Sequence, residues 1–142
     1  MDVERTGKCL CGAVSYTAKE VESMMAACHC GMCRRWTGGP FLSITAKDVA
    51  WTGEDKIKTF TSSPWAERGF CSECGTTLFY RVTAAGPHQG VAHIGYGTLD
   101  DQSGFEMGLE FFIDIKPDAY DFAGERKRLT EAEVMALFSG GT

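Results

Sequence analysis

The seven cysteines of this 142-residue chain constrain its fold more than any other feature, because none of them stands alone. They form three tight clusters, in which neighbouring thiols are two or three residues apart: Cys9 and Cys11; Cys28, Cys30 and Cys33; Cys71 and Cys74. Thiolates at this spacing can bind one metal ion without a large bend in the backbone. The clustering therefore predicts a fold built around metal ions.

The two outer pairs, Cys9 with Cys11 and Cys71 with Cys74, provide a complete set of four thiolate ligands. In an extended strand residues i and i+2 point to the same face, so Cys9 and Cys11 would present their sulfurs side by side. The second pair and the following Gly75 resemble a zinc knuckle, a tight turn in which glycine supplies a positive φ. One ion held between the pairs would join distant parts of the chain and contribute folding free energy. The alternative is four buried cysteines that bind no ion.

The central cluster provides only three thiolates, from Cys28, Cys30 and Cys33. Three protein ligands leave one position of a tetrahedral ion open, as in a catalytic or ligand-accepting zinc site. His29 is a possible fourth ligand, but an extended backbone would turn its side chain away from its neighbours, so we expect a polar or core histidine. Iron–sulfur ligation is the alternative at the level of the metal, since clusters also use cysteine ligands.

Arg34 and Arg35 follow the central cluster directly. Three thiolates on Zn²⁺ carry one net negative charge, which a neighbouring guanidinium could offset. The same arginines could bind an anionic substrate, and they are equally consistent with solvated side chains that pair with surface carboxylates. The substrate-binding role is therefore an expectation that depends on where the two side chains point.

The composition is that of an ordinary globular chain, with 44% hydrophobic and 23% charged residues, and we expect residues 1–142 to form one domain. No apolar run approaches the ~18 residues that a membrane span needs, and the N-terminal residues do not resemble a signal peptide. An odd number of clustered cysteines fits a disulfide framework poorly, so we expect a reducing cytoplasm. The net charge of −5 and the lack of a basic stretch argue against a nucleic-acid partner. The oligomeric state is not indicated.

Short alternating segments separated by glycine and proline predict a mainly β fold. We expect strands over residues 13–17, 41–45, 57–61, 77–82, 91–96 and 110–113. One helix is expected at the C-terminus, over about residues 130–139. Thr130 and Glu133 form a capping box there, and Leu129 with Val134 are placed for a hydrophobic staple. We expect its apolar stripe to pack on the sheet rather than bind a partner; the stripe consists of Val134, Leu137 and Phe138.

Several blocks of the sequence occur together in the order typical of one family. They are Cys9-Leu10-Cys11-Gly12-Ala13-Val14; Cys28-His29-Cys30 with Cys33-Arg34-Arg35, Thr37-Gly38 and Pro40-Phe41; Phe70-Cys71 with Cys74-Gly75-Thr76; and Gly97-Thr98-Leu99-Asp100. Each block alone is weak, but together they are specific and span roughly residues 7–117. On these residues the chain resembles the glutathione-dependent formaldehyde-activating enzyme family.

The resemblance implies a small β-tent of short antiparallel sheets that carries two zinc ions per chain. It implies that the outer pairs hold a structural ion and that Cys28, Cys30 and Cys33 hold a labile, catalytic one. The activity implied is the condensation of formaldehyde with glutathione to S-hydroxymethylglutathione, a reaction of the carbon–sulfur lyase class. Fold-level likeness alone does not fix the substrate, which depends on the site itself.

This chain departs from the family pattern near its last predicted strand. Glu110-Phe111-Phe112 stands where many members read His-Ile-Phe, and the usual tryptophan is missing near Ala119-Tyr120. If this region lines the pocket, the preferred substrate differs from that of the founding activity. The simpler expectation is that Phe111, Phe112 and Ile113 are ordinary strand core.

The expected mechanism places a substrate thiolate at the open position of the three-cysteine zinc, next to an aldehyde carbon. A second possibility is a covalent relay through one of the three cysteines as a mixed disulfide. The competing class is a non-catalytic zinc-binding adaptor or thiol-sensing module, and zinc storage or transfer is a third possibility. The aldehyde and the thiol cannot be named from the sequence.

Overall fold

The computed structural model describes residues 3–140 of the chain, with side chains up to residue 138. The strands in chain order are β1 (Val3–Lys8), β2 (Ser15–Val21), β3 (Met24–Cys28), β4 (Phe41–Ala46), β5 (Asp48–Thr52), β6 (Ile57–Ser63), β7 (Ala66–Cys71), β8 (Thr77–Val82), β9 (Ala92–Gly95), β10 (Glu106–Phe111) and β11 (Lys127–Leu129). The helices are α1 (Gly31–Thr37) and α2 (Glu131–Gly140), with 3-10 turns η1 (Glu54–Lys56), η2 (Tyr96–Thr98) and η3 (Ile113–Ile115). No helix in this part of the chain is long and apolar enough to cross a lipid bilayer.

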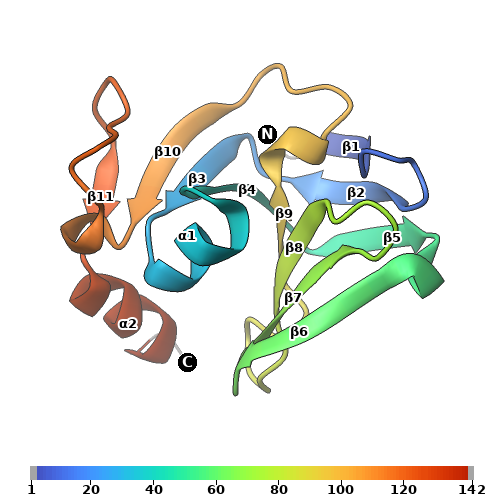
Figure 1. Cartoon of the computed structure of the whole chain (residues 1–142). Coiled ribbons are helices and arrows are strands. Elements are labelled where there is room, and N and C mark those ends of the chain that lie inside the picture. The colour runs from blue at the N-terminus through green and yellow to red at the C-terminus, as the bar shows by residue number, and fades with distance from the viewer. Residues whose placement is uncertain (1–2, 141–142) are drawn as a thin grey trace.

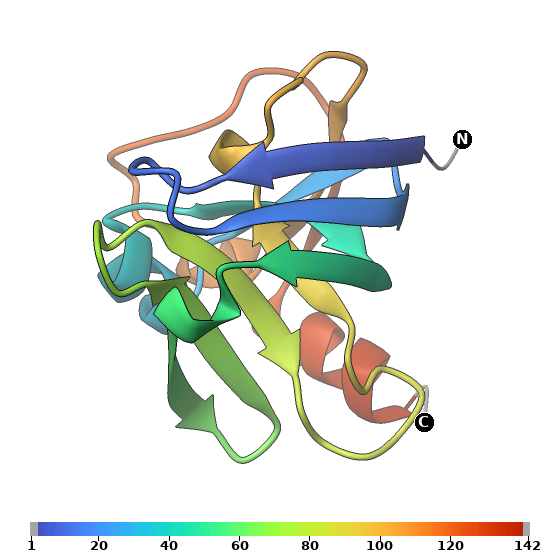
Figure 2. The same ribbon diagram turned by 90° about the vertical axis from the view of Figure 1, so that its right-hand side faces the viewer.

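The strands form a three-stranded sheet, in the order β1-β2-β5, and an eight-stranded sheet, in the order β11-β10-β3-β4-β9-β8-β7-β6. The neighbours are antiparallel, except that β10 pairs in parallel with both β3 and β11. In Figure 1 the large sheet bends into two arms, and α1 lies in the angle between them. Figure 2 shows β1, β2 and β5 side by side across one face of the molecule.

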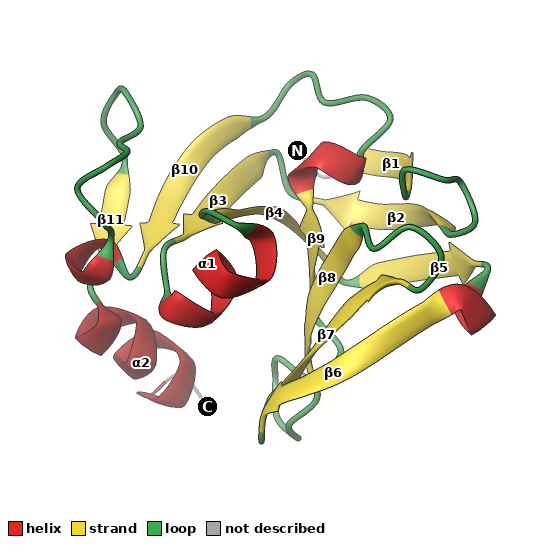
Figure 3. Ribbon diagram, in the orientation of Figure 1, coloured by secondary structure: helices red, strands yellow, loops and turns green. Residues whose placement is uncertain are grey.

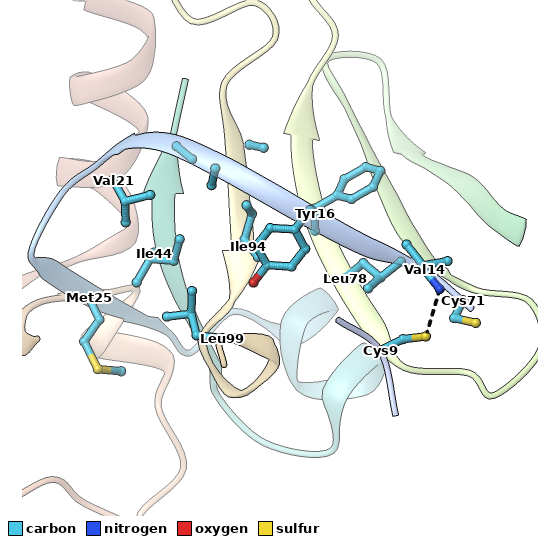
Figure 4. Packing of buried hydrophobic residues seen from close by; sticks show 14 residues of the cluster. Cys9, Val14, Tyr16, Val21, Met25, Ile44, Cys71, Leu78, Ile94 and Leu99 are labelled. Carbon is cyan, nitrogen blue, oxygen red and sulfur yellow. Dashed lines mark hydrogen bonds between the residues drawn. The ribbon is translucent and has the colours of Figure 1, made fainter. Parts of the chain in front are cut away.

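The hydrophobic core lies between the two sheets because their strands alternate buried and exposed residues. In β2, Tyr16 and Ala18 are buried while the residues between them are partly exposed. Ile44 of β4 and Ile94 of β9 face each other as cross-strand partners and are fully buried. Figure 4 shows that two cysteine side chains, Cys9 and Cys71, belong to this same cluster. One metal-candidate cluster is therefore continuous with the core.

The predicted fold class is confirmed: the chain is mainly β, with a helix near the C-terminus (Figure 3). The sequence missed β1, β3, β5, β7 and β11, and it missed α1. It also extended one strand too far, over residues 110–113. Strand β10 ends at Phe111, because Phe112 has a positive φ of 60° and leads into η3. Phe112 and Ile113 are thus not strand core, contrary to the expectation.

The predicted capping box of α2 is present. The backbone N–H of Thr130 donates to Glu133 Oε1 at 2.9 Å, and the N–H of Glu133 donates to Thr130 Oγ1 at 3.3 Å. Leu129 and Val134, the expected staple, are both buried.

The expectation that the whole apolar stripe of α2 packs on the sheet is wrong. Leu137 and Phe138 are 51% and 38% exposed. The Phe138 ring contacts only the edge of the fold, with the rings of His88 and Phe111 at centroid distances of 5.5 and 6.3 Å. Helix α2 contacts β11 and η3, and of its stripe only Val134 is buried among the described side chains.

A buried charge cluster joins β10 and β11 to the loop that carries the central cysteines. Glu110 is fully buried and accepts hydrogen bonds from His29 Nε2 at 2.8 Å, Arg126 Nη1 at 2.7 Å and Arg128 Nε at 2.9 Å. Burial alone raises the pKa of Glu110, but the bonds from Arg126, His29 and Arg128 outweigh it and hold the pKa below its usual value. The Glu110 carboxylate therefore stabilises the fold fully at neutral pH, and this contribution is lost as the pH falls through the lowered pKa.

We expect Glu110→Gln to lower the free energy of unfolding by about 3–5 kcal/mol, because it removes the fully buried carboxylate that the partly buried Arg126 and Arg128 share. The measurement is urea denaturation at neutral pH with the bound metal retained. Glu125→Gln is the matched control, since Glu125 also pairs with Arg128 but is 95% exposed, and it should change stability by less than about 1 kcal/mol. Equal midpoints for the two variants would contradict this account of the cluster.

Candidate metal centres

The two outer cysteine pairs lie in similar tight turns. The N–H of Cys71 donates to Thr76 O at 3.0 Å, and the N–H of Gly75 donates to Cys71 O at 2.8 Å. Gly75 has a φ of +79°, as a knuckle requires.

The first pair differs from the expectation, because Cys9 and Cys11 lie in a turn after β1 and not in an extended strand. There the N–H of Cys9 donates to Val14 O at 2.9 Å, and the N–H of Gly12 donates to Cys9 O at 3.1 Å. Gly12 has a φ of +82°, which allows the reversal.

The turns bring the four sulfurs of the outer pairs together, all within 4.8 Å of one another. Cys11 Sγ lies 3.7 Å from Cys9 Sγ and 3.9 Å from Cys71 Sγ. Four sulfurs around a tetrahedral zinc at ~2.3 Å would be about 3.8 Å apart, so this donor set fits a closed four-thiolate site. The N–H of Val14 donates to Cys9 Sγ at 3.3 Å (Figure 4), and hydrogen bonding by Thr76 lowers the pKa of Cys74 to about 5. Both contacts favour thiolates. We call these four residues the quartet.

The central cysteines also converge, with their three sulfurs within 4.8 Å of one another. Cys28 ends β3, Cys30 is the N-cap of α1, and Cys33 lies in the first turn of that helix. The Cys30 sulfur caps the helix by accepting a hydrogen bond from the N–H of Cys33 at 3.3 Å. Cys33 is buried, whereas Cys28 and Cys30 are partly exposed, so the cluster is open on one side. We call these three residues the triplet; the donors fit a zinc site with one free position.

His29 points away from the triplet, as the sequence led us to expect. It is fully buried, with Nε2 bonded to Glu110 and Nδ1 at 2.9 Å from the Tyr120 hydroxyl. The N–H of His29 donates to Phe111 O at 3.0 Å. Backbone and side chain together fix the loop between Cys28 and Cys30 against β10.

The two arginines proposed to contact substrate lie on α1 but differ in their surroundings. Arg34 is partly buried, and its Nε donates to His29 O at 2.9 Å. Arg35 is exposed and forms no hydrogen bond or ion pair with the residues that the structure describes. Neither guanidinium contacts a triplet sulfur, so the expected charge offset by these residues is not seen.

A different arginine, which the sequence did not single out, contacts the triplet. Arg68 of β7 is 5% exposed, and its Nη1 lies 3.5 Å from Cys33 Sγ. Its guanidinium carbon lies 4.9 Å from the Trp36 ring centroid and 5.0 Å from the Tyr80 ring centroid. One feature of the sequence could have indicated the burial of Arg68. It lies two positions after Ala66 in a strand, so both side chains point to the same face of the sheet, and that face is buried.

A groove of about 620 Å³ is lined by Trp36, whose ring also contacts the Arg68 guanidinium, but by none of the three triplet cysteines. It runs between the C-terminal end of α1, the two knuckles and η2. Its lining includes Lys8, Leu10, Trp36, Thr76, Tyr96 and Thr98. The Lys8 ammonium pairs with Asp100 at 2.7 Å, which leaves the groove mixed in character rather than strongly basic.

A family model, a relative and a solved structure are similar to this chain. Residues 4–114 match the sequence model described as glutathione-dependent formaldehyde-activating enzyme. An uncharacterized lyase of Schizosaccharomyces pombe is 34% identical over 134 residues, which cover 93% of this chain and 95% of that protein. A crystal structure of a Rhodobacter sphaeroides protein has the same fold with a TM-score of 0.57 at 21% identity, and the match covers 67% of this chain and 87% of that one.

We expect Cys74→Ser to unfold or insolubilise the protein. Loss of one quartet ligand would remove several kcal/mol from a domain that holds only about 5–15 kcal/mol in total. Ser72→Ala is the matched control, because Ser72 is an exposed residue of the same knuckle and its hydroxyl forms no hydrogen bond with the residues that the structure describes. The measurement is the melting temperature of the zinc-reconstituted proteins. A soluble Cys74→Ser protein with the same melting temperature as the parent would contradict the structural role assigned to the quartet.

Proposed function

Because the chain belongs to the glutathione-dependent formaldehyde-activating enzyme family, we propose that it is a zinc-dependent enzyme of the carbon–sulfur lyase type. Its substrates would be adducts of a thiol and an aldehyde, of which S-hydroxymethylglutathione is the example. The observation that carries this proposal is the triplet, a three-thiolate cluster open on one side. The name of the S. pombe relative, a lyase, supports the same reaction class.

The two cysteine clusters would hold two zinc ions per chain in different roles. The quartet, continuous with the core, would be structural, and the triplet would be catalytic. When bound at the triplet, zinc would supply a Lewis-acidic position that favours a thiolate over a neutral thiol. The seven free thiols support a location where cysteine stays reduced, such as the cytoplasm.

The protein's own residues would bind and orient the reactants. The groove has the size that small-molecule sites usually have, and its Trp36 ring contacts Arg68, whose Nη1 lies 3.5 Å from Cys33 Sγ. Arg35, exposed and without a protein partner, and the outer part of Arg34 are available for the carboxylates of glutathione. In the cleavage direction the C–S bond breaks, and the hydroxyl proton of the adduct passes to sulfur as thiol and aldehyde separate. Holding the two reactants close together would supply most of the rate acceleration, because the uncatalysed reaction already has a low barrier.

A thiol-sensing module is the second candidate, and one observation favours it. Hydrogen bonds from Cys28 and Cys33 lower the pKa of Cys30, and thiolate character makes cysteine prone to oxidation. A triplet without metal could form one disulfide and keep one thiol. Such a module would show no turnover.

We expect the parent protein to turn over glutathione with at least one member of an aldehyde panel, and Cys30→Ser to abolish this turnover. Serine is a good N-cap residue, so the substitution removes a ligand while it preserves the start of α1. Steady-state rates and melting temperatures are measured together. Met32→Ala, at an exposed position of the same helix, is the control and should retain activity. No turnover by the parent with any aldehyde would move the assignment to the sensing module.

We expect Arg34→Met and Arg35→Met each to weaken glutathione binding by about 1–3 kcal/mol if their charge-assisted hydrogen bonds form. The loss should shrink at high salt, because Arg35 is exposed and its charge is screened. Calorimetry on the zinc-loaded protein measures the affinity. Lys58→Met, which removes one exposed cation from the edge strand β6, controls for net charge. Affinity untouched by both arginine replacements would remove them from the site.

A further inference from the structure

Arg68 is a buried cation without a carboxylate partner among the residues that the structure describes. Its side chain is almost fully enclosed, and its Nε is buried with no hydrogen-bond partner. The one polar contact of its guanidinium is Cys33 Sγ, 3.5 Å from Nη1. Arg126, by comparison, has a side chain that is 8% exposed and pairs with the Glu110 carboxylate at 2.7 Å.

Two aromatic rings hold Arg68 in this position. Trp36 projects from α1, and Tyr80 is the cross-strand partner of Arg68 in the pairing of β7 with β8. The guanidinium lies over both rings at about 5 Å. Because one ring comes from the helix of the triplet and the other from the neighbouring strand β8, Arg68 links α1 to the β7–β8 arm of the large sheet. Such enclosure prevents the side chain from turning out into water.

Burying a guanidinium is costly unless an anion compensates it. The anions within reach are the thiolates of the triplet, since no carboxylate of the described residues pairs with Arg68. A divalent ion with three thiolates has one net negative charge, which a single guanidinium balances. A thiolate as fourth ligand adds a second negative charge, whereas a neutral ligand adds none. A fixed cation in a poorly solvated position lowers the energy of the more negative state.

We propose that Arg68 is a positioning and specificity-determining residue, which makes the triplet site prefer an anionic thiolate as its fourth ligand over a neutral donor. This inference rests on the proposed function, because it concerns the ligand of the same site. An opposite charge about 4–6 Å from an ionisable group shifts its proton equilibrium by about 1–3 pH units. The preference that Arg68 provides should therefore be roughly 10- to 1,000-fold. Arg34 and Arg35 do not provide it, since neither contacts a triplet sulfur.

The test compares the uptake of a thiol with the uptake of a neutral ligand. Protein carrying Co²⁺ in the triplet is titrated at fixed pH with 2-mercaptoethanol and, separately, with imidazole, and binding is followed in the visible spectrum. Cys30→Ser protein loaded in the same way provides the spectrum of the quartet for subtraction. The readout is the ratio of the two affinities, which a loss of stability alone would not change.

Four variants separate charge, hydrogen bonding and packing. Arg68→Gln keeps a donor without charge, Arg68→Met fills the space between the rings, and Arg68→Lys keeps the charge. Arg81→Gln is the matched control, because Arg81 pairs with Glu67, and Glu67 lies on the opposite face of β7 from Arg68.

We expect the thiol affinity of Arg68→Gln and Arg68→Met to fall roughly 10- to 1,000-fold while imidazole affinity changes little. Arg68→Lys should recover most of the thiol preference, and Arg81→Gln should equal the parent. An unchanged ratio in the charge-free variants overturns the proposal but leaves the proposed function standing, because the parent still takes up thiol. If neither charge-free variant folds, Arg68 is a structural residue and the proposal is overturned. Failure of the parent itself to take up thiol overturns both.

Discussion

The convergence of two turns on one point of the core is the constraint on which the fold depends. Cys11 and Cys71 are sixty residues apart in the chain, yet their sulfurs lie 3.9 Å apart. Cys9 and Cys71 are buried in the cluster formed between the two sheets. The quartet thus closes a long loop within the core, where a bound ion would remove the most unfolded-state entropy. With one end of the chain fixed in this way, the large sheet can bend and leave a concave side for α1.

The triplet is placed differently, by contacts on two opposite sides. On one side the loop between Cys28 and Cys30 is held through His29, whose ring bonds to Glu110 of β10. On the other side Cys33 meets Arg68 of β7. Each arm of the sheet therefore contributes one contact to a cluster that itself spans only six residues. This arrangement preforms the cluster, and it supports the proposal that the quartet is structural and the triplet reactive.

The features that the sequence predicted correctly are local ones. The capping box of Thr130 and Glu133 forms between residues three apart, and the Gly75 knuckle needs only its own turn. The features that it missed depend on distant partners. Strand β3, rich in Met and Ala, has little intrinsic strand preference and forms because β4 and β10 flank it. Helix α1 is only seven residues long, too short to show an apolar period.

The candidate site divides in the same way. Spacing alone brought the cysteines into two groups, and the resemblance to a family supported the same grouping. Arg68 could not be assigned from its position in the sequence, because its relation to Cys33 is made by the packing of β7 against α1. Phe138 shows the opposite error: its helical spacing suggested burial, but the side chain is 38% exposed and only partly covered by the rings of His88 and Phe111.

Peptide-resolved thiol alkylation tests the division into a closed and an open site most directly. Protein reconstituted with zinc is treated with a mild chelator until native mass spectrometry shows one ion per chain, and is then alkylated. We predict modification of Cys28, Cys30 and Cys33, protection of the quartet, and an unchanged circular dichroism spectrum. Modification of both clusters together with loss of structure would contradict the assignment of separate structural and reactive sites.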